Sequence, residues 1–161
     1  MIKGIIFDVD GTLYHQKPVR IMMALNMMLY YLIHFWKIKE LFIILKFRRI
    51  REKNTKQKYK DTLIQLSNNF KYDYKKIDIL INKWMFKKPL KYIKKYKNND
   101  VIELLNSFKN NNKKIIIYSD YNPIDKLKVL DINADYIFYP NDLDIKELKP
   151  SKKVMQYIIK K

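Results

Sequence analysis

The chain of 161 residues contains no cysteine, and this absence removes whole classes of chemistry. Disulfide bonds, thiolate nucleophiles and zinc sites built on cysteine are all excluded. Acidic residues are also few: the chain has 16 Asp and Glu against 34 Lys and Arg, which gives a formal net charge of +18. A chain without cysteine fits a reducing compartment, so we predict a cytoplasmic protein.

The excess of basic residues by itself points toward nucleic acid or an anionic membrane surface. Glycine and alanine are scarce, whereas the abundant Lys, Asn, Ile and Tyr are the amino acids of A/T-rich codons, so genome composition explains much of the charge. No basic segment with interleaved aromatic residues matches a known nucleic-acid module, and we predict no nucleic-acid partner. A signal peptide is also not expected, because the first apolar stretch is short and runs into acids.

An uninterrupted membrane span is not expected either, since a span needs about 20 mainly apolar residues. Polar residues interrupt the most apolar segment, residues 19–53, at four positions: Asn26, His34, Lys37 and Lys39. We predict two helices packed in a helical subdomain. The alternative is a basic amphipathic helix in weak contact with a membrane surface, because a basic cluster follows the apolar stretch: Arg48, Arg49 and Arg51.

Short, wholly apolar runs are present and are typical of buried parallel strands. Residues 5–7 predict a central strand buried on both faces, and residues 115–117 predict a second strand. A helix through residues 101–108, capped by Asp100, is expected before the second run, and a helix over 123–130 and a strand over 136–139 after it. The fold class is therefore α/β: a Rossmann-like parallel sheet built from residues 1–16 and 98–161, with residues 17–97 as an inserted α-helical cap.

Polar residues follow both apolar runs, at the carboxyl edge of the predicted sheet where open α/β proteins bind their ligands. Asp8, Asp10 and Thr12 follow the first run, and Ser119 follows the second. The sequence therefore predicts an active site at this edge. No carboxylate or second histidine lies at ligand spacing from either histidine of the chain, so neither is expected to bind metal. Tyr14 stays open as a gate to the site.

Three segments resemble, in order, the first three motifs of the haloacid dehalogenase-like (HAD) hydrolase superfamily. They are "DVDGTLY" after an apolar strand, the serine that ends the strand in "IIIYSD", and the lysine before proline in "ELKPS". The resemblance covers residues 1 to about 14 and about 100 to 161. The segment between them is similar to the family's helical cap in position, length and helical character alone.

The resemblance implies a phosphatase-type hydrolase of a small phosphorylated metabolite. Asp8 would attack phosphorus and form an aspartyl phosphate, and Asp10 would act as general acid and then as base. Thr12 would support the substrate loop, Ser119 would donate a hydrogen bond to a phosphoryl oxygen, and Lys149 would hold Asp8 and the phosphoryl charge. A Mg²⁺ ion is implied between the Asp8 carboxylate and the Asp10 backbone carbonyl. A mutase that shares the first step stays open.

The family's fourth motif, an acidic pair after a further strand, would follow a helix expected to begin at about Pro150. The chain ends at Lys161, inside that helix, so we expect a sheet and a metal site that are incomplete at the C-terminal end and an impaired activity. Such a sheet would leave the first strand with one bare edge. The competing prediction is a non-catalytic remnant, or an interaction protein whose basic helical insert binds a membrane surface. The sequence leaves the substrate and the oligomeric state open.

Overall fold

The computed structural model describes residues 3–53, 58–139 and Gln156, and it divides the chain into two compact units. The sheet unit comprises residues 1–19 and 90–161, and the helical unit comprises residues 20–89. The helical unit ends earlier than the predicted insert, which extended to residue 97. Residues 90–97 belong to the sheet unit because their helix, α5 (Leu90–Lys95), packs against α7 (Ile124–Leu130) of that unit.

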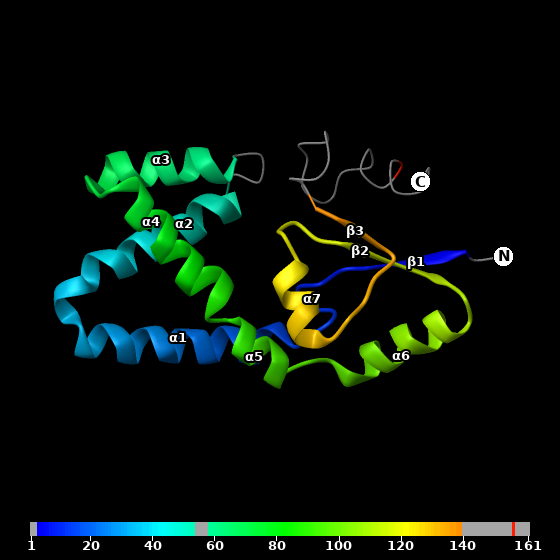
Figure 1. Cartoon of the computed structure of the whole chain (residues 1–161). Helices are drawn as coiled ribbons and strands as arrows, with labels where there is room; N and C mark the ends of the chain where they lie inside the picture. The colour runs from blue at the N-terminus through cyan, green and yellow to red at the C-terminus, as the bar shows by residue number, and fades with distance from the viewer. Residues whose placement is uncertain (1–2, 54–57, 140–155, 157–161) are drawn as a thin grey trace. The chain divides into compact units, whose positions relative to one another are not determined.

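Three parallel strands form the sheet, in the order β1 (Gly4–Phe7), β2 (Lys114–Tyr118) and β3 (Tyr136–Phe138). The helix α6 (Asn99–Asn110) precedes β2, and α7 joins β2 to β3. Figure 1 shows both helices on the same side of the sheet, as right-handed crossovers between parallel strands require. Together with the family-level comparison below, this topology confirms the predicted α/β class.

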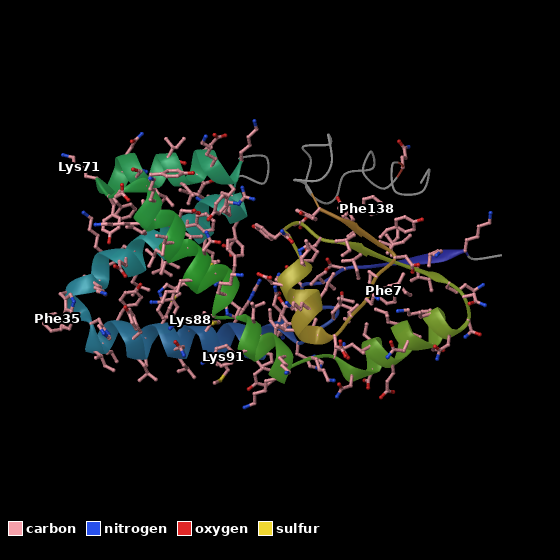
Figure 2. All side chains as sticks on the ribbon, viewed as in Figure 1. Phe7, Phe35, Lys71, Lys88, Lys91 and Phe138 are labelled. Atoms are coloured by element: carbon pink, nitrogen blue, oxygen red, sulfur yellow. The ribbon has the colours of Figure 1, made fainter. Side chains whose placement is uncertain are left out.

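The core of the sheet lies on the face that α6 and α7 cover. Ile115 and Ile117 of β2 are fully buried there, and Phe7, which pairs with Ile117, is nearly so. The opposite face carries a smaller cluster in which Tyr118 and Phe138 pack with half-buried Ile6 and Ile116, and Figure 2 labels Phe7 and Phe138 within this unit. Alternate residues of β2 thus serve the two faces, as the pleat of a strand requires.

Two details of the predicted sheet unit are wrong. Gly4, Ile5 and Ile6 of β1 are only half-buried, whereas the sequence predicts burial on both faces; in the described sheet β1 lies at the edge, as expected for a sheet that leaves this strand one bare edge. The N-cap of α6 is Asn98, whose side chain accepts the Val101 N–H, because the helix begins at residue 99. Asp100 instead lies in the first turn, where a negative charge suits the positive end of the helix dipole.

The helical unit contains most of α1 (Gln16–Ile33), then α2 (Ile38–Lys53), α3 (Tyr59–Phe70) and α4 (Tyr74–Ile81). A 3-10 turn, Phe35–Lys37, joins α1 to α2, and a π-helical segment, Asn82–Lys87, follows α4. Three helices pack on one another, α2 with α3, α2 with α4, and α3 with α4. Their contacts bury apolar residues at helical spacing: Ile43, Ile44, Phe47, Leu63, Leu66, Ile77 and Ile81.

Candidate functional site at the carboxyl edge of the sheet

The ends of β1 and β2 bring the two predicted motifs to one edge of the sheet. Phe7 pairs with Ile117, so the register carried one residue further sets Asp8 level with Tyr118 and next to the position of Ser119. The Ser119 N–H donates to the Phe138 carbonyl at 3.0 Å, which ties the end of β2 to the end of β3. Backbone pairing between the strands thus fixes the position of Ser119, independently of the contacts of its side chain.

The Ser119 side chain is buried, with 1% of the residue exposed. Its Oγ accepts a long hydrogen bond, 3.4 Å, from the Tyr121 N–H in the loop that follows β2. Burial, and then the charge of Asp120, raise the pKa of neighbouring Tyr118, so its phenol stays protonated at neutral pH. The Ser119 hydroxyl accepts the bond from the Tyr121 N–H with its oxygen, so its hydrogen is left to donate a hydrogen bond.

One oxygen of the Asp10 carboxylate accepts from two side chains of the sheet unit. Lys126 of α7 reaches its Oδ1 with Nζ at 2.5 Å, and the Tyr14 hydroxyl donates to the same oxygen. The side chains of Asp10 and Lys126 are 27% and 15% exposed, so the ion pair is mostly shielded from solvent, and Tyr14 is buried. Two donors on one oxygen hold the Asp10 carboxylate in a single orientation.

The loop after Asp10 takes its shape from one glycine and one asparagine. Gly11 has a φ of +96°, a backbone conformation that only glycine adopts without strain. Asn98 then anchors the loop, since its side-chain amide donates to the Thr12 carbonyl at 3.1 Å and its backbone N–H donates to the Leu13 carbonyl at 3.0 Å. Half-buried Thr12 thus lies in a loop fixed from both sides.

Sequence reasoning missed Lys126 and Asn98. Lys126 is one of 34 basic residues, and its partner lies 116 positions away, so composition offers no hint. One local signal was available, because Lys126 lies in the first turn of α7, where the helix dipole disfavours a cation unless an anion is near. For Asn98 the signal was the N-cap preference of asparagine, which we assigned instead to Asp100.

Four of the predicted site residues lie in the sheet unit at or beside the carboxyl edge: Asp8, Asp10, Thr12 and Ser119. Asp8 is half-buried there. Lys149 and the helix expected from about Pro150 lie outside the described residues. The catalytic and binding roles of these residues stay predictions.

The described residues offer oxygen atoms to a metal ion. The half-buried Asp8 carboxylate and the Asp10 backbone carbonyl are the hard ligands that Mg²⁺ prefers, whereas the Asp10 carboxylate is engaged by Lys126 and Tyr14. Within residues 3–53 and 58–139 no three His, Asp or Glu side chains converge on one point. The donor set therefore fits Mg²⁺ in kind and supplies part of its ligands.

Comparison with known families bears on the whole chain. The family model described as haloacid dehalogenase-like hydrolase matches residues 2–161. Among curated proteins no sequence matches this one. The match includes the ends of β1 and β2 and the helical unit between them. Because it extends over nearly the whole sequence, the chain belongs to the haloacid dehalogenase-like hydrolase family.

Proposed function

We propose that this hydrolase is a Mg²⁺-dependent phosphatase that cleaves a small phosphomonoester through an aspartyl phosphate on Asp8. The observation that carries the proposal is the pair of carboxylates at the end of β1, of which the second is oriented by Lys126 and Tyr14. An acid at the position of Asp10 is the feature that distinguishes phosphatases from dehalogenases in the family. A fixed second carboxylate suits proton transfer, which depends on geometry before anything else.

In the first step an Asp8 oxygen forms a bond to phosphorus while the bond from phosphorus to the substrate oxygen breaks. The departing alkoxide takes a proton from the Asp10 carboxyl, and since Oδ1 is engaged by two donors, we assign that proton to Oδ2. The alcohol then leaves. The Asp10 carboxylate next accepts a proton from water, whose oxygen attacks phosphorus, and the bond to Asp8 breaks to release phosphate.

The remaining groups bind and orient the substrate. The Ser119 hydroxyl is the proposed donor to a phosphoryl oxygen, and the Thr12 loop, anchored by Asn98, is the proposed support of the phosphoryl group. Bound Mg²⁺, held by the Asp8 carboxylate and the Asp10 carbonyl, would supply positive charge to the phosphoryl oxygens. Lys149 is proposed to hold the Asp8 carboxylate. Preorganised charge of this kind is usually the largest contribution to catalysis.

Asp8→Asn is the decisive variant because asparagine keeps the shape of the side chain and removes the nucleophile. Turnover of an aryl phosphate by the wild-type chain should require added Mg²⁺, and acid-quenched protein should carry covalent phosphate at Asp8. Asp8→Asn should lose both signals, whereas Asp100→Asn, a change at an exposed aspartate of α6, should keep them. If turnover in Asp8→Asn stays within about tenfold of wild type, Asp8 is not the nucleophile.

A further inference from the structure

A continuous apolar surface covers one side of α1 in the helical unit. Its members, here called the α1 outer face, are 46–68% exposed and recur at helical spacing: Ile21, Leu25, Met28, Leu29, Leu32 and Ile33. Phe35 and Trp36 continue the surface at the turn into α2, with 70% and 64% exposed. A soluble protein rarely exposes so many neighbouring large apolar side chains unless they meet a partner.

The packing of the helical unit explains why this face stays uncovered. Figure 1 shows α2, α3 and α4 on one side of α1. On that side Met23 and Tyr31 are buried, and Lys88 donates to Asn26 at 3.2 Å while its Nζ lies 3.8 Å from the centre of the Trp84 ring. Figure 2 places Lys88 beside α1 and Phe35 at the outer end of the helix. The inward face of α1 is thus covered by contacts within its unit, whereas the outer face is exposed.

Charge is distributed around this surface in a specific way. Residues 21–36 contain no Asp, Glu, Lys or Arg, and basic residues flank them on both sides. Lys17 and Arg20 precede the outer face, and several basic residues follow it along α2: Lys37, Lys39, Lys46, Arg48 and Arg49. Between residues 16 and 53 the acids are Glu40 and Glu52 alone, and Glu52 is paired with Arg48 at 2.8 Å.

We propose that the α1 outer face docks on a lipid bilayer that carries anionic headgroups. The apolar side chains would enter the boundary between headgroups and acyl chains, and the basic residues that directly border the face, Lys17, Arg20 and Lys37, would meet the lipid phosphates or carboxylates. Phe35 and Trp36 suit the same boundary, where aromatic rings concentrate. A second copy of this chain fits the surface less well, because copies that each carry a net charge of +18 repel one another.

The geometry favours a helix lying on the membrane over one crossing it. Among the described residues no single helix is long and apolar enough to span a bilayer, and α1 with the following Phe35–Lys53 passes a test of length and composition only as a pair bent by 113°. The inward face of α1 also contacts the rest of its unit, since Tyr30 and Tyr31 pack on the Trp84 ring and Asn26 accepts from Lys88. Peripheral binding by one face requires neither a longer helix nor unpacking.

The test is sedimentation of the full chain with vesicles of phosphatidylcholine alone or mixed with phosphatidylserine. We expect binding to the mixed vesicles, weaker binding to phosphatidylcholine, and release at high salt. The double variant Leu29→Asp, Leu32→Asp should bind the mixed vesicles about 10- to 100-fold more weakly. The matched control is Ile64→Asp, Ile79→Asp, which places the same charges at exposed apolar positions of α3 and α4 and should change binding less than about twofold.

Several outcomes would overturn the proposal. One is equal vesicle binding by the wild type and the Leu29, Leu32 variant, and another is equal binding of the wild type to both kinds of vesicle. A third is a wild-type oligomer that this variant dissociates in the absence of any vesicle binding, which would make the face an interface between copies. Should the variant unfold, a shift of Trp36 fluorescence on addition of mixed vesicles, present in the wild type and absent from Trp36→Phe, decides the matter instead. None of these measurements depends on phosphatase activity.

Discussion

Polar and apolar side chains are distributed differently in the sheet unit and the helical unit. In the sheet unit Asp10, Lys126 and Tyr14 meet in partly buried polar contacts at the carboxyl edge, where Ser119 is also buried. In the described part of the helical unit the buried residues are apolar or aromatic apart from Thr62, whose hydroxyl donates to the Lys58 carbonyl at the N-cap of its helix, and part-buried polar contacts such as Tyr59 with Asp78 join one helix to another. Polar contacts thus orient a carboxylate at the edge of the sheet, whereas in the helical unit they join helices that pack through apolar side chains.

This difference has a consequence for substitution experiments. Changes inside the helical unit should reduce the free energy of unfolding, because they remove packing contacts and little else. Changes at the sheet edge should reduce turnover more than stability, because the groups there orient a carboxylate.

Two tryptophans of the helical unit give the sharpest contrast between interior and surface. Trp84 is 1% exposed, between the rings of Tyr30 and Tyr31 and the ammonium of Lys88, so Trp84→Ala should reduce the free energy of unfolding by about 3–5 kcal/mol. Trp36 is 64% exposed, so Trp36→Ala should change it by less than about 0.5 kcal/mol. Urea denaturation of both variants provides the measurement. Equal losses would mean that Trp36 is covered in solution.

At the sheet edge the corresponding variant is Lys126→Met, which keeps the length of the side chain and removes its charge. Loss of the hydrogen bond to Asp10 should reduce kcat by roughly 10- to 100-fold with little change in KM, because orientation and not binding is lost. Lys126→Arg should recover part of the rate. The control is Lys128→Met, an exposed lysine of the same helix, and equal rates for the two methionine variants would exclude a positioning role for Lys126.

Local patterns predicted the elements that local physics determines. The apolar run at residues 115–117 identified β2, because an uninterrupted apolar run of this length is typical of a buried parallel strand. Strand ends predicted where Asp8 and Ser119 lie, since parallel strands share a carboxyl edge.

Features that depend on distant partners escaped prediction. The ion pair of Lys126 with Asp10 joins residues that lie 116 positions apart in the sequence. Periodicity also groups residues on a face without saying whether anything covers it. The outer and inner faces of α1 are both apolar in sequence, and only the packing of the unit distinguishes them.

Each unit also has a residue with positive φ, and substitutions there should change the free energy of unfolding by a smaller amount. Gly11→Ala should reduce the free energy of unfolding by about 1–2 kcal/mol, because φ is +96° there while no atom lies closer than 4.0 Å to the added Cβ. The same change should also lower turnover, since it disturbs the loop that holds Asp10. The reciprocal change in the helical unit, Lys71→Gly, relieves a φ of 47° at the end of α3 and should leave stability unchanged or higher. Thermal melting of both variants provides the measurement. A lower melting temperature of Gly11→Ala together with an unchanged or higher one of Lys71→Gly would indicate that the backbone conformation, and not contact of the added Cβ with other atoms, is responsible.

The smallest expected effect concerns Asp135 in the sheet unit, and it appears only in the pH dependence. Its Oδ1 accepts from Lys114 Nζ at 2.9 Å and its Oδ2 from the Ile115 N–H at 2.9 Å, which fixes the start of β2. The Lys114 hydrogen bond first, and then the Ile115 N–H, lower the pKa of Asp135 from its model-peptide value of 3.8. The folded state therefore binds this proton less readily than the unfolded state does.

Because the pKa is lowered on folding, the contribution of Asp135 to stability is complete above the unfolded pKa of 3.8 and is lost as the pH falls through the folded value. Asp135→Asn should accordingly lower the melting temperature at neutral pH, and the difference from wild type should shrink as the solution is acidified below that unfolded pKa. Asp131→Asn, at an exposed aspartate of the same unit, is the matched control and should show no such convergence. A constant difference at every pH would mean that the asparagine disturbs β2 through its shape, because the loss of an ionised carboxylate has no effect once the carboxylate is protonated.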